Sequence, residues 1–152
     1  MKTGVGPTPM TDTFTSAARK RVMSRIKSKN TRPELIVRKY LYSKGIRYRL
    51  HRKTLPGKPD IVVSKIKTVL FINGCFWHHH EGCKRANWPK SNKDYWIPKI
   101  ERNIVRDAEN ASSLEKLGWN RIVVWECEIG GLESHGILQE MIQEYLHKDR
   151  HE

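Results

Sequence analysis

The sequence predicts an α/β protein in which helices pack against a mixed sheet. Three short runs rich in β-branched residues have the length of buried strands, and a fourth run alternates basic and apolar residues. Longer segments repeat apolar residues with the spacing of a helix. In chain order these give a helix, three strands, a long helix, a strand and a last helix, an order typical of layered α/β folds.

The first helix of this pattern has a clear start. Thr31 and Glu34 match a capping box, and Pro33 is tolerated in a first helical turn. A stop follows at Gly45, after a basic Lys44. The apolar residues that recur between them at helical spacing are Leu35, Ile36, Tyr40 and Leu41.

A predicted hairpin comes next, with an acid at one end. Residues 46–50 alternate as a half-exposed strand does, and the rigid loop 55–59 leads to Asp60. Asp60 opens the apolar run Ile61–Val63, and a turn at 64–67 leads into a second buried strand at 68–72.

The second half predicts a long helix, a strand and an amphipathic helix. The long helix starts near Ser91 or Pro98 and ends at Gly118, with Ile100, Ile104, Ala108, Ala111, Leu114 and Leu117 on one face. Residues 121–125 form a strand that carries Cys127 past its end. The last helix has Ile137, Leu138, Met141, Ile142, Tyr145 and Leu146 on one face.

Length and composition favour one basic domain. We expect residues 1–14 to be a disordered arm and residues 15–150 to be a single domain of the 152-residue chain. Lys and Arg number 29 against 16 acidic residues, a net charge of +13 that suits a polyanion such as nucleic acid, although heparin-binding and membrane-surface proteins share it. The basic segment 15–29 is either a helix lying on DNA or a solvated basic face.

Without a signal-peptide pattern or a long apolar stretch, we expect a cytoplasmic protein.

The loop after the hairpin concentrates thiols and imidazoles. Cys75, His80 and Cys83 lie close together in sequence, and Cys127 returns from a distant element. Three thiolates and one imidazole at such spacing predict a tetrahedral zinc site. The alternatives are three unrelated buried cysteines or a redox pair, and the latter is disfavoured because no C-x-x-C occurs.

Asp60 is a candidate ligand for a hard cation. A carboxylate at the start of a buried strand is desolvated unless it meets a positive charge. Mg2+ is usually bound by one or two carboxylates, carbonyl groups and waters. The simpler interpretation is an aspartate that caps a turn.

Several motifs in the right order resemble the very-short-patch repair endonucleases. The resemblance covers roughly residues 18–127 and rests on the runs 55–60, 74–80 and 124–127, together with Tyr95, Trp96, Lys99, Ile100, Asn103, Gly118 and Trp119. It implies a restriction-endonuclease-like fold with a structural zinc. It also implies a bacterial, nucleoid-associated enzyme that uses Mg2+ to nick DNA 5′ to the thymine of a T:G mismatch left by deamination of 5-methylcytosine.

The resemblance also implies roles for individual residues. Asp60 and the backbone carbonyl of Ile72 match the Mg2+ ligands, and His78 matches the histidine that activates water or shuttles protons. Glu34 matches an acid near the metals, although its capping role explains it equally well. Cys75, His80, Cys83 and Cys127 match the zinc ligands. Cys83 comes one residue late, so His79 is an alternative ligand.

Asn73 departs from the pattern, because the best-known members carry a histidine there. An amide is neither a general acid nor a general base at neutral pH, so His78 must carry the proton chemistry.

The resemblance implies DNA contacts as well. Phe76, Trp77 and Trp96 match aromatics that enter the base stack from the major groove, and Met23 matches a wedge from the other side. Lys99 and Asn103 are further candidates for DNA contacts. Packing around the zinc loop is the simpler explanation for Phe76 and Trp77.

Three hypotheses about function follow. The first is a mismatch nickase that acts as a monomer on double-stranded DNA, with mismatch-repair proteins as candidate partners. The second, motivated by Asn73, is a catalytically weakened, zinc-stabilised module that binds mismatches. The third is an HNH-type nuclease, against which the cysteine set argues.

Overall fold

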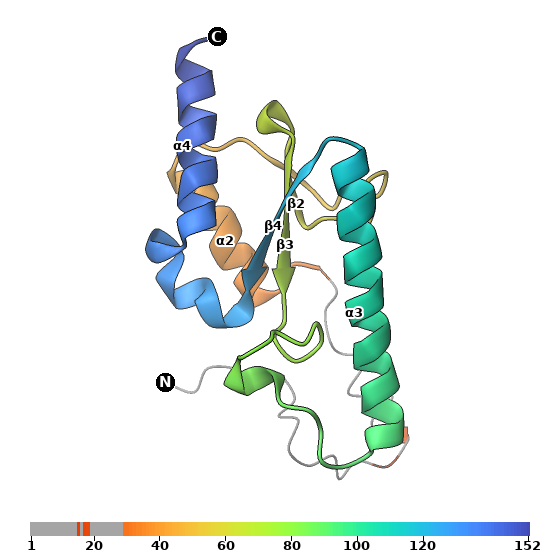
Figure 1. The fold of residues 1–152 in the computed structure, drawn as a ribbon. Coiled ribbons are helices and arrows are strands. Elements are labelled where there is room, and N and C mark those ends of the chain that lie inside the picture. The colour runs from red at the N-terminus through yellow and green to blue at the C-terminus, as the bar shows by residue number, and fades with distance from the viewer. Residues whose placement is uncertain (1–14, 16, 19–28) are drawn as a thin grey trace.

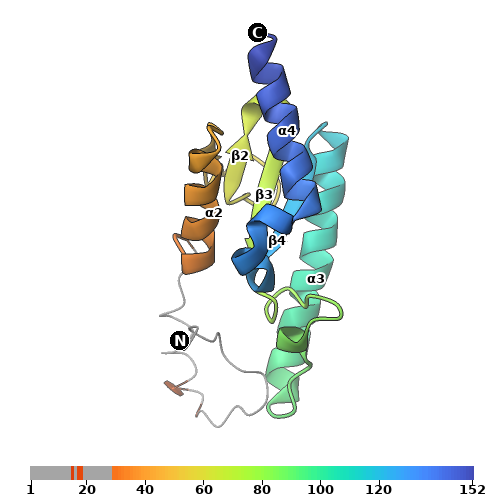
Figure 2. The same ribbon diagram turned by 90° about the vertical axis from the view of Figure 1, so that its left-hand side faces the viewer.

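The fold is a four-stranded sheet covered by helices on both faces (Figures 1 and 2). The computed structural model describes residues 15, 17, 18 and 29–152. The strands lie in the order β1-β2-β3-β4, with β3 antiparallel to β2 and parallel to β4. They are β1 (Arg49–Leu50), β2 (Ile61–Val63), β3 (Thr68–Asn73) and β4 (Asn120–Trp125). The predicted mixed sheet is confirmed, while the predicted arm at 1–14, Met23 and most of the basic segment 15–29 lie outside the described residues.

Two helices cover one face of the sheet and a third covers the other (Figure 2). Helices α2 (Arg32–Ser43) and α4 (Gly136–Arg150) share one core with the sheet, while α3 (Lys93–Lys116) packs Leu114 against the opposite face. Because side chains alternate along a strand, Ile61 and Val63 join the first core and Val62 joins the second. Short 3-10 segments complete the chain: η1 (Ser64–Ile66), η2 (Lys84–Ala86) and η3 (Glu126–Ser134).

The topology brings the ends of three strands together along one rim of the sheet, where the strands end. β3 and β4 are parallel, so their C-terminal ends lie there, and β2 begins there because it is antiparallel to β3. Asp60 precedes β2, Asn73 ends β3, and Cys127 follows β4. The candidate residues of the sequence therefore meet at the edge where α/β sheets commonly bind ligands.

Two parts of the predicted pattern are wrong. Residues 46–50 form a strand only at Arg49 and Leu50, which are both exposed. Several residues predicted on the apolar faces of the helices are exposed instead of facing a core: Leu35 at 40%, Ile104 at 38%, Leu117 at 56% and Ile137 at 61%. Ile104 is exposed because α3 meets the sheet near Leu114 and extends well beyond it.

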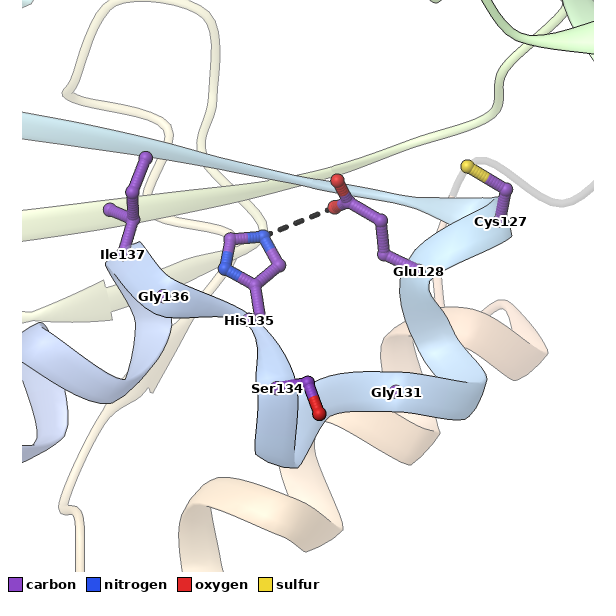
Figure 3. A pocket seen from close by; sticks show the side chains of 7 residues that line it. All are labelled: Cys127, Glu128, Gly131, Ser134, His135, Gly136 and Ile137. Carbon is purple, nitrogen blue, oxygen red and sulfur yellow. Dashed lines mark hydrogen bonds and ion pairs between the residues drawn. The ribbon is translucent and has the colours of Figure 1, made fainter.

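The junction between η3 and α4 is held by one histidine (Figure 3). The Nδ1 atom of His135 accepts from the Leu138 amide at 3.2 Å and so caps α4, while Nε2 lies 3.1 Å from Oε2 of Glu128. A cavity of about 420 Å³ opens between these residues and Cys127. This junction fixes the segment that carries Cys127 beyond β4.

No helix in the described part of the chain combines the length and apolar character that spanning a membrane requires.

Candidate functional site

Asp60 is held in place by backbone atoms of β3. Its amide donates to the Leu70 carbonyl at 3.1 Å, and the Ile72 amide donates to Oδ2 of Asp60 at 2.8 Å. Burial raises the pKa of Asp60 from 3.8 to about 6, and the nearby Glu34 charge adds to this, whereas the Ile72 hydrogen bond, His51 and His78 lower it. Burial therefore outweighs the favourable contacts and disfavours the ionised carboxylate.

Glu34 has a capping contact and also faces Asp60. Its amide donates to Oγ1 of Thr31 at 3.4 Å, and its Oε2 accepts from the Asn30 amide at 3.0 Å. The return bond of the predicted capping box thus goes to Asn30 and not to Thr31. Its other oxygen, Oε1, lies 3.0 Å from Nη2 of Arg38, and the side chain is 2% exposed. The two interpretations of Glu34 from sequence are therefore compatible.

His51 belongs to the same cluster, although the sequence analysis did not single it out. Its Nε2 lies 2.7 Å from Oε1 of Glu34, and ligand atoms of Glu34, His51 and Asp60 all lie within 4.8 Å of one another. Two carboxylates and an imidazole are suited to a divalent cation. A signal existed in the sequence, because the alternating run 46–50 leads directly to this histidine.

His78 is paired with a residue that the sequence analysis also missed. Its Nδ1 lies 2.6 Å from Oδ2 of Asp107 on α3, and each side chain is 30% exposed. A carboxylate oxygen accepts, so Nδ1 carries the proton and the neutral ring has its lone pair on Nε2. The signal for Asp107 was its helical spacing from Ile100 and Leu114, at positions 100, 107 and 114.

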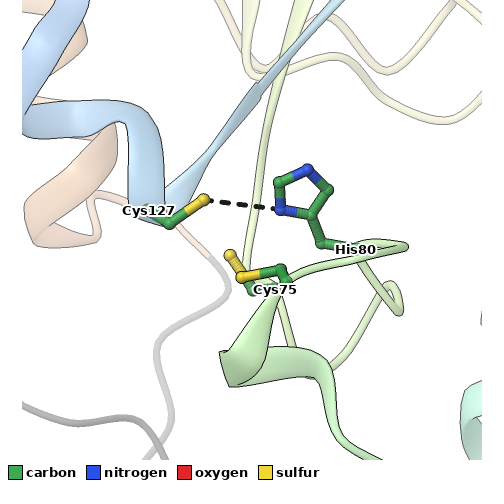
Figure 4. Close-up of side chains that lie close together, drawn as sticks. Cys75, His80 and Cys127 are labelled. Atoms are coloured by element: carbon green, nitrogen blue, oxygen red, sulfur yellow. Dashed lines mark hydrogen bonds between the residues drawn. The ribbon is translucent and has the colours of Figure 1, made fainter.

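The cysteine cluster forms a second potential metal site (Figure 4). Ligand atoms of Cys75, His80, Cys83 and Cys127 lie within 4.8 Å of one another, and the Cys127 sulfur is 3.4 Å from Nδ1 of His80. Burial together with the neighbouring Cys127 and Cys83 raises the pKa of the Cys75 thiol to about 12. Such a thiol stays protonated without a cation, so the donor set fits a thiophilic metal ion.

Stacking separates the two candidate histidines of this loop. The His80 ring lies flat on Trp125, with centroids 4.2 Å apart and planes 5° apart. His79 stacks on Trp88 instead, at 4.3 Å. The structure thus groups His80, and not His79, with the cysteines.

The aromatic candidates form a cluster at the N-terminal end of α3. Phe76 and Trp96 are 8% and 6% exposed, and both pack with Trp77. Nζ of Lys99 lies 5.4 Å from the centre of the Trp77 ring, and the Asn103 side chain donates to the Trp77 carbonyl at 2.8 Å. The candidates for DNA contacts that the structure describes therefore pack mainly against one another.

Asn73 is the last residue of β3 and is 7% exposed. It lies directly before the Gly74-Cys75 pair that begins the metal-binding loop.

Comparison with known proteins identifies the family. The model of the family described as DNA mismatch endonuclease Vsr matches residues 11–85. The chain is 54% identical over 120 residues to the type II nicking enzyme V.NmeAIP of Neisseria meningitidis, covering 79% of this chain and 85% of that protein. The chain belongs to the Vsr family of mismatch endonucleases. Within the family it is also 51% identical to the type II nicking enzyme V.XorIIP of Xanthomonas oryzae over 81% of this chain and 90% of that protein. It is 35% identical to the DNA mismatch endonuclease Vsr of Escherichia coli over 90% and 88% respectively.

Membership of the Vsr family establishes the class of enzyme. The chain is a DNA endonuclease, and hence a hydrolase, with the restriction-endonuclease-like fold of the Vsr family. The resemblance inferred from the sequence motifs is confirmed.

Proposed function

We propose that this Vsr-family enzyme nicks one DNA strand 5′ to the thymine of a T:G mismatch left by deamination of 5-methylcytosine. The observation that carries the proposal is the convergence of Asp60, Glu34 and the His78–Asp107 pair at the edge of the sheet beside the cysteine cluster. The names of the relatives support it, because two are called nicking enzymes and one a mismatch endonuclease.

In this proposal Asp60 and the Ile72 carbonyl bind Mg2+, and Glu34 acts beside them. The fit rests on the donor set, since burial disfavours the ionised Asp60 carboxylate and a cation would stabilise it. When bound, the ion would stabilise the negative charge that develops on the scissile phosphate.

The proton transfer is assigned to His78. Because Nδ1 of His78 is hydrogen-bonded to Asp107, Nε2 is the ring atom able to accept a proton from the attacking water. Asp107 fixes the tautomer and the direction of the ring, in the way that a buried carboxylate orients a catalytic histidine. Asn73 takes no part in this transfer.

We further propose that Cys75, His80, Cys83 and Cys127 hold a structural Zn2+ ion. Structural zinc sites use closed sets of four thiolate and imidazole ligands, and this set is of that kind. The ion would join the loop after β3 to the segment after β4 and thereby hold His78 near Asp60.

Recognition of the mismatch is assigned to the aromatic cluster around Trp77. A mismatch loosens the stack, so inserting side chains beside it costs less than at a matched pair. Phe76 and Trp96 are buried in the DNA-free protein, and their contact with bases requires this cluster to open. Lys99 and Met23 are proposed to make further contacts with the DNA.

The test is a set of duplexes, each with one mismatch, incubated with and without Mg2+, with any nick mapped on both strands. A single nick 5′ to the thymine of T:G that requires Mg2+ is expected. Equal cutting of all mismatches, or of matched DNA, would contradict the proposal.

The second candidate is a weakened enzyme that mainly binds mismatches, and it is favoured by Asn73 at the end of β3. Asn73→His separates the two candidates. Faster nicking would indicate a weakened site, whereas unchanged nicking would show that residue 73 carries no proton.

A further inference from the structure

His51 lies at the proposed active site without a role in the proposed mechanism. It follows β1, and its ring reaches across to Glu34 on α2, where Nε2 lies 2.7 Å from Oε1. The ring is 17% exposed, so solvent reaches only part of it. A histidine in this position is either an ion-pair partner of Glu34 or a ligand for a cation.

The geometry of the cluster fits an ion. A cation bonded to its ligands at about 2.1 Å places opposite ligand atoms about 4.2 Å apart. Ligand atoms of Glu34, His51 and Asp60 already lie within 4.8 Å of one another. The three residues are thus close enough to share one ion, and the 2.7 Å contact between Nε2 of His51 and Oε1 of Glu34 has to open for both atoms to bind it.

Glu34 does not depend on His51 for compensation of its charge. Nη2 of Arg38 lies 3.0 Å from the same oxygen, donates to Oδ1 of Asn30 at 2.6 Å, and lies 3.3 Å from Nε2 of His51. If the imidazole turns its nitrogen to a cation, Arg38 still neutralises Glu34. The cluster thus permits His51 to leave its present contact without leaving a buried charge unpaired.

The backbone holds His51 in place. Its φ of +48° lies in the left-handed region, which non-glycine residues adopt infrequently. Its amide donates to the Asp60 carbonyl at 3.2 Å, which ties this conformation directly to the proposed metal ligand. The position of the imidazole and that of the Asp60 carboxylate are therefore set by the same short piece of sheet.

We propose that His51 is a nitrogen ligand of the divalent cation that Asp60 binds, and that it makes the site prefer Mn2+ to Mg2+. This rests on the proposed function in one respect, that Asp60 binds a cation. Mg2+ takes oxygen ligands almost alone, whereas an imidazole favours first-row transition metals. Mg2+ sustains nicking in this scheme, and Mn2+ binds more tightly at the same place.

The experiment measures metal binding by the full chain, loaded with zinc and free of DNA. Zinc occupies the thiol site and keeps Mn2+ out of it, because thiolates strongly favour zinc over Mn2+. Electron paramagnetic resonance follows bound Mn2+, and pulsed spectra report whether a nitrogen atom is bonded to it. Competition with Mg2+ gives the relative affinities.

We expect nitrogen coupling on one bound Mn2+ in the wild-type protein and its loss in His51→Gln. In that variant Mn2+ affinity should fall by roughly tenfold or more, the scale of changes around metal sites, while Mg2+ affinity changes by less than about twofold. His151→Gln is the matched control, because it removes an exposed histidine whose ring lies 4.4 Å from that of His147, a pair able to bind metal adventitiously. It should leave the coupling intact.

Three results would overturn the inference: no nitrogen coupling in the wild type, coupling that persists in His51→Gln, or equal losses of Mn2+ and Mg2+ affinity. The wild-type spectrum alone tests whether a nitrogen atom binds the metal, even if His51→Gln folds poorly. The duplex assay keeps the two proposals apart. Nicking without nitrogen coupling contradicts only the inference, whereas coupling without nicking contradicts only the proposed function.

Discussion

At the scale of single residues, the Asp60 carboxylate is shaped by competition between burial and its neighbours. Burial raises its pKa more than the Ile72 amide, His51 and His78 lower it. A charged group in this state destabilises the metal-free fold and favours binding of a cation. In the proposed function, the same imbalance favours metal binding at the expense of stability.

The first prediction concerns Asp60→Asn. Because the folded pKa of about 6 lies above the ordinary value of 3.8, the folded state binds the proton more tightly, and stability falls as the pH rises from about 4 to 6. The amide can still accept from Ile72 but carries no charge. Without Mg2+, the variant should therefore be more stable than the wild type near neutral pH, by at most about 3 kcal/mol. Urea unfolding of zinc-loaded protein from about pH 5 to about pH 7 measures this, and the difference should grow with pH.

Asp60→Asn should also stop nicking while binding of T:G duplexes remains, since only the anchor for the cation is removed. Asp149→Asn, which alters an exposed carboxylate paired with Lys65, is the control and should nick normally. Nicking by Asp60→Asn at the wild-type rate with Mg2+ would rule out the proposed mechanism.

The second prediction concerns the pair formed by His78 and Asp107. Asp107→Asn removes the carboxylate that accepts from Nδ1, so the ring loses its fixed tautomer. Nicking should slow by roughly 10²- to 10⁴-fold, as for loss of a general base, in single-turnover assays.

His78→Ala should give a loss of similar size, and the double variant should lose little more, because the two residues act as a unit. Affinity for the duplex should stay the same in all three variants. Losses that multiply in the double variant would show that Asp107 acts independently of His78.

At the scale of elements, α3 serves the site along its whole length. Trp96 and Ile100 build the aromatic cluster at one end, and Leu114 packs on the sheet at the other. Between them, Asn103 and Asp107 turn polar groups to the loop that carries Trp77 and His78. One face of α3 thus carries apolar side chains at its two ends and polar side chains between them. Ile104 lies outside this face and is exposed.

The third prediction concerns the link between the β3 loop and η3. Cys127→Ala should lose zinc and unfold at a lower temperature, because the ion joins elements that are distant in sequence. Any loss of catalysis should follow from this loss of stability. Metal analysis and thermal unfolding of the same sample measure this. His79→Ala, outside the cluster, should keep its zinc. Wild-type protein purified without chelator that is stable yet zinc-free would contradict a structural zinc.

At the scale of the whole molecule, the net charge of +13 governs the encounter with DNA. The fourth prediction is that affinity falls steeply with salt, with each displaced counterion adding about 0.9 to the slope of log affinity against log salt concentration. Titrations with T:G and fully matched duplexes measure it. The slopes should be similar and the affinities different, since phosphate contacts are common to both. A slope near zero would exclude binding driven by phosphates.

The sequence by itself determined the buried strands, the helices and the cysteine cluster. Continuous apolar runs such as Ile61–Val63 indicate buried strands, and thiols grouped with a histidine at short spacing indicate metal binding. The motifs 55–60 and 74–80 likewise indicated the family, and Asp60 as the acid of the site.

Only the tertiary structure decided which polar residues complete that site. His51 and Asp107 reach Glu34 and His78 across elements that are far apart in sequence, and their local sequence places them on a strand end and a helix face without showing these partners. The structure also placed Glu34 both at a helix cap and beside Asp60, and it grouped His80 instead of His79 with the cysteines. The physical reason is that local sequence determines backbone preference and burial, whereas the pairing of charged side chains depends on how the helices pack on the sheet.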